Sequence, residues 1–436
     1  MSTSSTYRCI DLFAGIGGIR KGFELAAGDD GLETVFVSEY DKYAATTYAA
    51  NFDTPSDVIE GIDDLLMGVG GARIYGDITK VFDSDLECIR PFDICLAGFP
   101  CQAFSQAGKR KGFEDDYKGM ARGTLFRELI RICEINRPKV VFCENVKGLL
   151  GHDGGKTLEV ICGAFDEAGY EVFYDVLNSS NFDVPQKRER LYIVAFRKEI
   201  APEAFAFPKG TPTEKRIKDI FEQQPVDSRY YLSTQYLETL KKHRLRHEEK
   251  GNGFGYQVRG LDELAGTLSC GGMGRERNLL VDNRPHETGV IGLKHSPINS
   301  ENIRKMTPRE WARLQGFPNT YKLPVADSHL YKQLGNTVTI TVIRAIAAEI
   351  FDYLDKLFNS RKIGHVRERK IIDCLTGSSA THEELLNELA PLFLSSEPDD
   401  KISRSVSNTL QAMKRKGQIG VVGKTSSAVW HISLPN

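Results

Sequence analysis

The stretch "RCIDLFAGIGG", residues 8–18, places an apolar run directly before a cluster of glycines. Such a pattern is typical of a buried strand that turns sharply into a helix. Glycines in this turn let backbone N–H groups approach a ligand at the N-terminus of the helix. The spacing is not G-x-G-x-x-G, so a pyrophosphate site is only weakly indicated, and a plain tight turn remains the alternative.

The same alternation continues along the chain to residue 197. Further short apolar runs lie at residues 34–40, 93–99, 139–145, 171–178 and 190–196. Helix-like segments separate them, such as 124–135, in which apolar residues recur at helical spacing. This order predicts an α/β fold with a mostly parallel sheet covered by helices on both faces.

The rest of the chain divides into three further parts. Residues 198–303 lose the alternation and are rich in Pro, Gly and charge, which predicts a small loop-rich domain. Residues 304–358 are again helical, which indicates a return to the first domain, residues 1–197. A polar break near 359–366 precedes a tail, 366–436, with three expected helices and a hairpin, as in a winged helix. One of these helices has a capping box, formed by Thr381 and Glu384.

Composition limits the class of protein. The chain has 436 residues, 27% of them charged, and a formal net charge of −2. Its nine cysteines include no C-x-x-C pair, which argues against a zinc ribbon or a disulfide framework and favours the cytoplasm. We expect no signal peptide, membrane helix or metal site. Basic clusters at 109–111, 186–190, 241–247 and 274–277 are candidate polyanion sites, although charge runs are usually solvated faces.

Two acidic residues suit the same kind of ligand as the glycine turn. Glu39, in "SEYD", lies where a carboxylate can accept both ribose hydroxyls of a nucleoside. Asp77, in "YGDIT", lies at another loop and suits an adenine amino group. Together with the glycine turn, these residues fit an adenosine ligand without a diphosphate.

A thiol and a carboxyl follow two more strands. Cys101 follows the run in "DICLAGFPCQAFSQAG", residues 93–108, and Glu144 ends the run in "KVVFCENVKGL", residues 139–149. A buried thiol and a solvated carboxylate are the alternative interpretations. At the carboxyl ends of neighbouring strands, however, a thiolate can add to an electrophilic ring carbon while a carboxyl neutralises a ring nitrogen. Cys143 faces the other way by strand alternation and is expected in the core.

In combination, these motifs resemble the DNA (cytosine-5)-methyltransferases of bacterial restriction-modification systems. The resemblance covers about residues 8–355 and rests on "DLFAGIGG", "GFPCQAFS", "ENV", "QKRERLYIV", "TPREWARLQGFP" and "YKQLGNTV", in that order. It implies a Rossmann-like fold that uses S-adenosyl-L-methionine. The implied reaction is methyl transfer to C5 of a cytosine that is flipped out of a short duplex DNA site.

The resemblance also implies roles for particular residues. Cys101 would attack C6 of the cytosine, Pro100 would shape its loop, and Glu144 would bind N3. Arg188 and Arg190 would brace this loop and bind the base carbonyl or a nearby phosphate. The implied cofactor-binding residues are Phe13, Gly15, Gly17, Gly18, Glu39, Asp77, Ile78, Asn336 and Val338.

The DNA partner is expected to meet two regions. The segment 198–303 resembles the recognition region of methyltransferases that act on CCGG sites, and Arg275 and Arg277 would contact guanines or phosphates. The loop after Cys101 resembles a mobile lid whose basic residues would clamp phosphates: Lys109, Arg110, Lys111 and Arg122. A cognate restriction endonuclease and a monomeric state fit this class of protein.

Two other functions remain open from the sequence. The first is cytosine-5 methylation of RNA, which some proteins of this architecture perform. The second is DNA-binding regulation through the tail, in which the helix expected at 402–416 would present Arg404, Ser405, Asn408 and Arg415. A winged helix that serves only as an interaction module is the alternative for this tail.

Overall fold

A computed structural model describes most of the chain. The described residues are 6–55, 62, 65–69, 71–99, 116–117, 120–121, 125–252, 255–271, 274–284, 290–291, 296–376, 378–422 and 428–433. Pro100, Cys101 and the basic lid residues Lys109, Arg110, Lys111 and Arg122 lie outside them.

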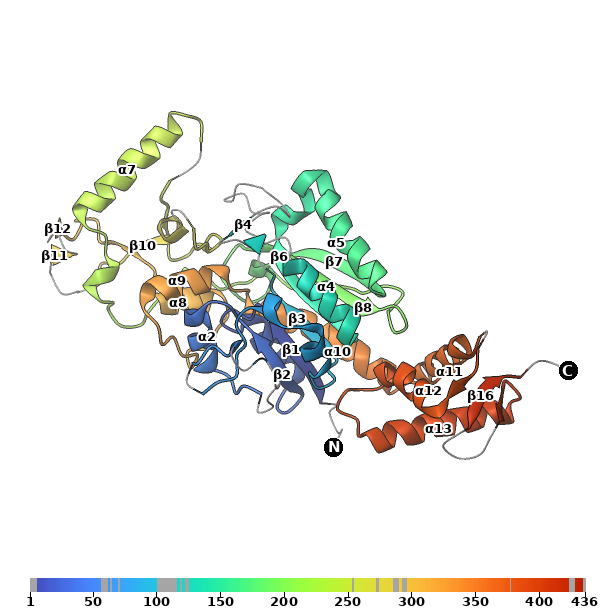
Figure 1. Cartoon of the computed structure of the whole chain (residues 1–436). Helices are drawn as coiled ribbons and strands as arrows, with labels where there is room; N and C mark the ends of the chain where they lie inside the picture. Colours follow the sequence, from blue (N-terminus) through green and yellow to red (C-terminus); the bar gives the residue numbers. More distant parts are fainter. Residues whose placement is uncertain are drawn as a thin grey trace.

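The centre of the molecule is a six-stranded sheet in the order β2-β1-β3-β6-β8-β7 (Figure 1). Its strands are β1 (Tyr7–Leu12), β2 (Leu32–Ser38), β3 (Ile94–Ala97), β6 (Val140–Val146), β7 (Tyr170–Asn178) and β8 (Glu189–Arg197). β2, β1, β3 and β6 are parallel, and β8 runs antiparallel to both β6 and β7. The expected α/β fold with a mixed, mostly parallel sheet is confirmed.

Helices cover both faces of this sheet, because neighbouring strand residues point to opposite sides. Ile94 and Leu96 belong to one apolar cluster, together with residues of α1 (Gly18–Ala27) and α10 (Ile340–Phe358). Cys95 and Ala97 belong to a second cluster, which includes residues of α3 (Asp83–Glu87), α4 (Leu125–Asn136) and α5 (Lys156–Glu167). The segment that contains α10 has therefore returned to the first domain, as the sequence predicts. Beside β2, α2 (Lys42–Ala49) contributes to a third cluster.

One apolar segment has the length of a membrane span. Among the described residues, the segment 327–358 is long and apolar enough to cross a membrane, judged by length and composition alone. It comprises α9 (Asp327–Asn336) and α10. Two thirds of the most apolar window (67%) is buried inside the protein. Packing of α10 in the core accounts for this composition.

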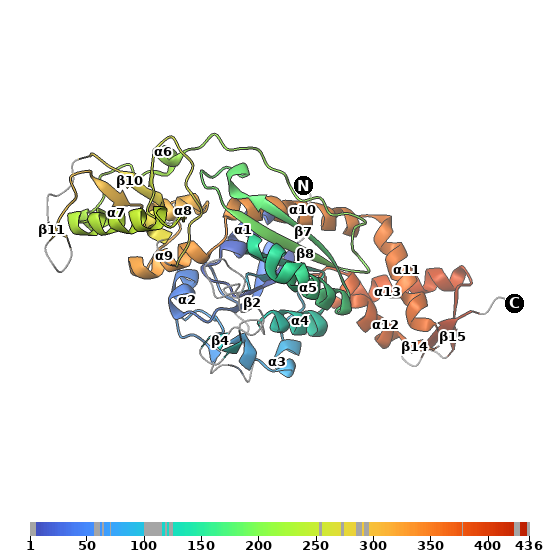
Figure 2. The same cartoon turned by 90° about the horizontal axis from the view of Figure 1, so that it is seen from above.

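Most of the recognition segment, residues 198–305, lies at one end of the sheet (Figure 2), whereas Ile200, near its start, packs in the core with Leu357 and Leu392. It contains α6 (Ile217–Ile220), α7 (Thr234–Glu248) and a small sheet in the order β13-β10-β9, formed by Ile303–Lys305, Leu279–Val281 and Val258–Arg259. The short strands β11 (Val290–Ile291) and β12 (Ser296–Pro297) pair beside it, and β4 (Asp116–Tyr117) pairs with β5 (Met120–Ala121) elsewhere.

The helix expected from residue 304 begins later than the sequence suggested. Residues 303–305 form β13, which pairs with β10, so the expected boundary at residue 303 falls inside a strand. α8 (Pro308–Leu314) starts only after Thr307, whose hydroxyl accepts a hydrogen bond from the Glu310 N–H. This capping box, with Pro308 in the first turn, fixes the start of the helix.

The tail forms a separate bundle of helices and strands. Its elements are α11 (Arg361–Leu375), β14 (Ala380–Thr381), α12 (His382–Leu389), α13 (Asp399–Arg415), β15 (Ile419–Val422) and β16 (Val429–Ile432). This is the element order of a winged helix, with the sheet order β14-β16-β15. The capping box at Thr381 and Glu384 is confirmed. The expected break at 359–366 is shorter than predicted: only residues 359 and 360 separate α10 from α11, which begins at residue 361 and buries Ile363 in the apolar core.

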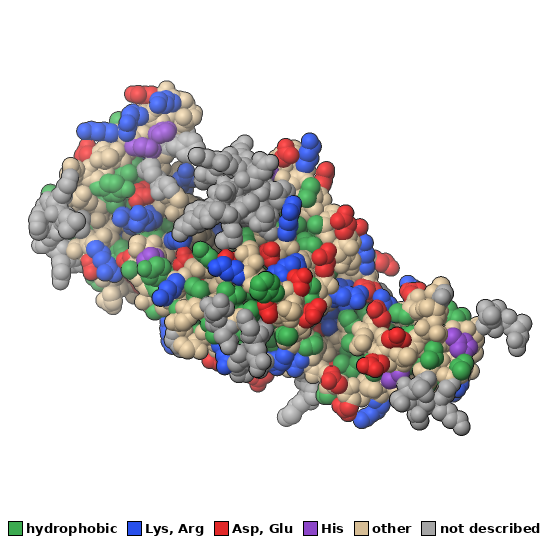
Figure 3. All heavy atoms as spheres, in the orientation of Figure 1, with side chains coloured by type: hydrophobic (Ala, Val, Ile, Leu, Met, Phe, Trp, Pro, Cys, Tyr) green, Lys and Arg blue, Asp and Glu red, His purple; other side chains and the backbone are tan. Residues whose placement is uncertain are grey.

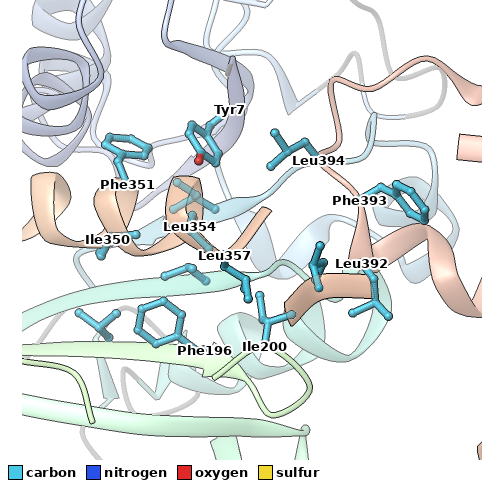
Figure 4. Close-up of a cluster of buried hydrophobic side chains, with 14 of the residues drawn as sticks. Tyr7, Phe196, Ile200, Ile350, Phe351, Leu354, Leu357, Leu392, Phe393 and Leu394 are labelled. Atoms are coloured by element: carbon cyan, nitrogen blue, oxygen red, sulfur yellow. The ribbon is translucent and has the colours of Figure 1, made fainter. Parts of the chain in front are cut away.

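The tail docks against the amino ends of the central strands. Leu392, Phe393 and Leu394 join the same apolar cluster as Tyr7 and Leu357 (Figure 4). Polar contacts flank this cluster: the buried Asp93 carboxylate, just before β3, accepts the Ser395 N–H at 3.0 Å and pairs with Lys139, just before β6, at 2.7 Å. The opposite edge of the sheet, where the parallel strands end, is therefore left to the loops that carry the candidate site.

Candidate active site

Three strands bring their carboxyl ends to one point. Leu12 of β1 pairs with Ala97 of β3, and Ala97 pairs with Cys143 of β6. The next residues, Phe13, Gly98 and Glu144, therefore lie at the same edge. Phe13 has φ 54°, a left-handed conformation that costs an L-residue about 1–2 kcal/mol. Backbone strain of this kind is concentrated at functional sites.

The glycine turn brings the start of α1 against the returning segment. Gly17 has φ 75°, and a Cβ built there would lie 2.2 Å from the Phe52 ring. A Cβ on Gly18 would lie 2.5 Å from Thr337 Oγ1 and 2.9 Å from a methyl group of Val338. Because Gly17 is the N-cap residue and has no side chain, the first N–H groups of α1 remain available to a ligand.

The Glu39 carboxylate lies beside this turn. Its Oε2 accepts the Gly15 N–H at 2.7 Å and its Oε1 accepts the Asp41 N–H at 2.6 Å. Burial raises the pKa of Glu39, although these two backbone donors lower it. A carboxylate has about four acceptor positions, so one bond to each oxygen leaves both oxygens able to accept another donor.

Asp77 lies next to Glu39 in space. The Glu39 N–H donates to the Tyr75 carbonyl at 2.8 Å, and Tyr75 forms a parallel bridge with Ser38 at the end of β2. Asp77 Oδ1 accepts the N–H of Thr79 at 3.1 Å and its hydroxyl at 2.8 Å, and so caps a short helical turn. Its neighbour Ile78 is buried in the core.

The last two expected cofactor residues differ from each other in exposure. Val338 is buried against Gly18. Asn336 is exposed at the end of α9, where its Oδ1 accepts a hydrogen bond from the Cys270 thiol at 2.8 Å. Segments before and after the recognition segment therefore meet at the start of α1.

Glu144 and Arg190 form a partly enclosed ion pair at the exit of β6. Arg190 Nε lies 3.2 Å from Glu144 Oε1, and the two side chains are only 15% and 11% exposed. Burial raises the pKa of Glu144, while Arg190 and Arg188 lower it. A carboxyl of this kind can donate a proton or a hydrogen bond to a ring nitrogen.

Arg188 makes different contacts from those the sequence suggested. Its buried guanidinium donates to the carbonyls of Leu268 at 2.8 Å, Thr337 at 2.7 Å and Gly335 at 3.3 Å. Burial lowers the pKa of Arg188 to about 9. Arg188 therefore joins the recognition segment to the returning segment, and Arg190 is the arginine beside Glu144. The expected contact of Arg188 with the base or a phosphate stays a prediction.

The two arginines expected to read DNA are exposed on the recognition segment. Arg275 and Arg277 lie in a short helical turn, residues 274–278, on either side of the buried Glu276. Arg275 also lies over the Tyr331 ring, 5.5 Å from its centroid. On the face shown in Figure 3, Lys and Arg side chains follow α7 of the same segment, whereas many acidic side chains cover α4 and α5. The recognition segment thus presents local positive charge on a protein of net negative charge.

Four of the described cysteines lie in the core. Cys9, Cys95, Cys133 and Cys143 are buried, and burial raises the pKa of each thiol. Such thiols are poor nucleophiles because the thiolate is the reactive form. Cys143 is in the core, as the sequence predicts.

A buried polar cluster under the glycine turn was not predicted. Asp11 in β1 accepts a hydrogen bond from the Tyr48 hydroxyl at 3.1 Å, and Arg20 of α1 donates to the same hydroxyl at 3.1 Å. Within the described part of the chain, Asp11 Oδ1 has no hydrogen-bond partner. Burial raises the pKa of Asp11 to about 7, against the opposing effects of Arg20 and Tyr48.

An Asp11→Asn variant should gain stability relative to the wild type as the pH rises from 5 to 8. The folded protein holds the Asp11 proton up to about pH 7, whereas the unfolded chain releases it near pH 4. Wild-type stability therefore falls as the pH rises through this window, and the amide does not titrate. From pH 5 to pH 8, the free energy of unfolding of the variant should therefore rise relative to that of the wild type by up to about 3 kcal/mol. Urea unfolding of both proteins at the two pH values measures this change. The exposed variant Asp352→Asn is the control, and an equal response of the two variants would contradict the prediction.

A second unpredicted cluster joins the recognition segment to α8. The fully buried Arg304 donates to both carboxylate oxygens of Glu310 at 2.8 Å and to Asp282 Oδ2 at 2.8 Å. Arg284 forms a second bidentate pair with Asp282. This cluster, called the Arg304 network below, fixes β10 and β13 against the start of α8.

Comparisons with known proteins agree with this geometry. The family model described as "C-5 cytosine-specific DNA methylase" matches residues 7–352. The Type II methyltransferase M.HpaII of Haemophilus parainfluenzae is 46% identical over 353 residues, which cover 80% of this chain and 90% of that protein. The Type II methyltransferase M.SsoII of Shigella sonnei is 40% identical over 359 residues, which cover 80% of this chain and 81% of that protein. Among solved structures, the Entamoeba histolytica methyltransferase EhMeth has a TM-score of 0.59 at 18% identity over 81% of this chain and 99% of that one. The S. pombe Dnmt2 methyltransferase has a TM-score of 0.58 at 20% identity, over 80% of this chain and 99% of that one.

The chain therefore belongs to the C-5 cytosine-specific DNA methylase family. It is a DNA cytosine-5 methyltransferase of the restriction-modification type, and S-adenosylmethionine is its methyl donor. The tail lies beyond the residues that the family model matches.

Proposed function

We propose that this enzyme methylates C5 of a cytosine in CCGG, or in a longer site that contains it, through a covalent bond from Cys101 to C6. The Glu144–Arg190 pair at the exit of β6 is the observation that carries this proposal. Gly98 lies beside it at the end of β3, and Cys101 follows Gly98 by three residues. Three residues of chain span at most about 11 Å, which is short enough to bring a thiol to the same cytosine.

In the proposed reaction, Cys101 and Glu144 act on opposite sides of one bond-making step. The Cys101 thiolate adds to C6 of the cytosine while Glu144 protonates or hydrogen-bonds N3, so that electron density moves to C5. Arg190 binds the base carbonyl and holds Glu144 in place. C5 then takes the methyl group, and the electrons of the broken bond stay on the donor sulfur. A base removes the C5 proton, the Cys101 thiolate leaves as the C5–C6 double bond re-forms, and any proton on N3 returns to Glu144. S-adenosylmethionine supplies an electrophilic methyl group on a sulfonium ion.

The residues at the carboxyl edge fit this donor. Glu39 has acceptor capacity for two ribose hydroxyls after its bonds to Gly15 and Asp41. Asp77 Oδ2, the oxygen that Thr79 does not use, would accept from the adenine amino group. Phe13 and Ile78 would provide apolar surface for the adenine. The glycine turn at Gly17 and Gly18, where the Gly17 N–H is bonded to the Ala14 carbonyl and the Gly18 N–H opens α1, would complete the site with Asn336 and Val338.

The DNA site would be shared between the domains. We assign residues 1–197 and 304–358 to catalysis, 198–303 to target recognition and 366–436 to an additional domain, with β13 crossing one boundary. Arg275 and Arg277 would contact guanines or phosphates, and Lys109, Arg110, Lys111 and Arg122 would clamp phosphates around a flipped cytosine, with Pro100 shaping the Cys101 loop. A monomeric enzyme in the cytoplasm, paired with a restriction endonuclease for the same site, fits this function.

Methylation mapping tests the proposal. Plasmid DNA from a host that expresses the protein should carry 5-methylcytosine at nearly every CCGG in bisulfite sequencing, and plasmid from the same host without the gene should not. Transfer RNA from the same cells should gain no methylcytosine. Unmethylated CCGG sites would refute the proposed target, and methylation at another sequence would leave the family activity intact.

A further inference from the structure

We propose that the exposed face of α13 binds a second segment of duplex DNA, separate from the duplex that is methylated. The residues of this helix divide sharply by exposure. Val406, Leu410 and Met413 are buried. From residue 401 to the end of the helix, every exposed residue is Lys, Arg, Asn or Gln: Lys401, Arg404, Asn408, Gln411, Lys414 and Arg415.

The spacing of these side chains gives them one common face. Lys401, Arg404, Asn408, Gln411 and Arg415 follow one another at intervals of three or four residues, which is one stripe of a helix. Lys and Arg bind phosphates, Asn and Gln can pair with adenine, and Arg can pair with guanine. Asp399 lies off this stripe, and Asp400 lies at its N-terminal end, where it pairs with Arg404.

The ion pairs on this face are weak enough to exchange for phosphates. Arg404 lies 3.2 Å from Asp400, and both side chains are more than 70% exposed. Lys401 lies 3.3 Å from Glu397 and is also largely exposed. Exposed pairs of this kind contribute about 0–1 kcal/mol, so a phosphate can compete with the carboxylates.

Charge and topology favour a nucleic acid over a protein partner. Residues 361–436 contain eleven Lys and Arg against eight Asp and Glu, whereas the whole chain contains 57 against 59. The tail therefore carries a local excess of positive charge on a chain whose net charge is negative. α13 follows α12 and precedes the β15–β16 hairpin, which is the position of the helix that enters the major groove in helix-turn-helix proteins.

The docking of the tail separates this face from the active site. The tail packs on the amino ends of β1, β3 and β6 through Tyr7, Asp93 and Lys139, whereas Glu144 lies at the carboxyl end of β6. In both views the tail and the recognition helix α7 lie at opposite ends of the molecule (Figures 1 and 2). A short duplex held at the active site would therefore leave α13 free for another.

The test counts duplexes on the full-length protein. Deletion of the tail would expose the apolar residues that surround Leu357, so surface substitutions are the cleaner change. The variant is Arg404→Ala/Arg415→Ala, and the control Lys356→Ala/Arg369→Ala removes the same charge from exposed positions outside α13. Native mass spectrometry would use a duplex of about 14 base pairs, little more than one helical turn, that contains CCGG.

Wild type and control should bind two duplexes per chain, and the Arg404→Ala/Arg415→Ala variant should bind one. The affinity for the second duplex should fall at least about tenfold in this variant. Its decrease with rising salt concentration should become less steep, by the amount expected for the loss of about two phosphate contacts. Methylation of the short duplex should be unchanged. A wild type that binds a single duplex, or a variant that keeps two, would overturn the proposal whatever sequence the enzyme methylates.

Discussion

A Cys101→Ala variant should lose methyl transfer to DNA by about 10⁴-fold or more, because no other step can replace a covalent nucleophile. The mechanism needs C6 of the cytosine to be saturated before C5 can take a methyl group. Glu144 and Arg190 polarise the ring but do not supply the electron pair. Radioactive methyl transfer to a CCGG duplex measures the loss, and duplex binding should persist, since the recognition segment is unchanged.

The control for this variant is another single cysteine substitution. Cys88 is exposed and lies at the end of α3, so Cys88→Ala should retain wild-type turnover. A duplex that carries 5-fluorocytosine at the target should form a covalent adduct with the wild type and Cys88→Ala, and none with Cys101→Ala. An adduct on a different residue, or turnover that survives in Cys101→Ala, would remove Cys101 as the nucleophile.

The central sheet was predictable because its signals are local. Each strand is an apolar run bounded by polar or turn residues, and the buried strands contain Ile94, Val141 and Ile193 in such runs. Short strands carry no such signal. β13 and β14 have three and two residues, and only their partners β10 and β16 make them strands.

The candidate site was predictable as a set of positions but not as a set of contacts. Motif order locates Glu39 and Glu144 at strand ends and Asp77 in a nearby loop, and the parallel register brings those strand ends to one edge of the sheet. The contacts of Arg188 were missed because its three carbonyl partners lie 80 to 149 residues away in the chain. Asp11 was missed for a similar reason, since only the fold brings Tyr48 and Arg20 to it.

The Arg304 network was predictable only in part. The T-x-x-E pattern of residues 307–310 predicts a capping box from sequence alone. The sequence gives no sign that Glu310 also pairs with Arg304, or that Asp282 shares that guanidinium. The capping residue is therefore also the anchor between α8 and the recognition segment.

An Arg304→Met variant should lower the free energy of unfolding by about 3–5 kcal/mol. The substitution keeps much of the apolar volume beside Phe221 but leaves the fully buried Glu310 carboxylate without its cation. Asp282 keeps Arg284, so the cost falls mainly on Glu310. Trp311 is buried next to Glu310, and the chain has one other tryptophan, Trp430. In a Trp430→Phe background, urea unfolding followed by Trp311 fluorescence therefore reports on this region.

The same substitution at an exposed ion pair gives the comparison that decides the prediction. Arg404 and Asp400 form a pair of the same chemical type at the surface, and Arg404→Met should change stability by about 1 kcal/mol or less. The contrast follows from solvation, since water replaces a lost partner at the surface but not around Glu310. Adding Glu310→Gln to Arg304→Met should recover part of the loss by removing the unpaired charge. If Arg304→Met and Arg404→Met unfold at the same urea concentration, the Arg304 network contributes nothing to the junction between α8 and the recognition segment.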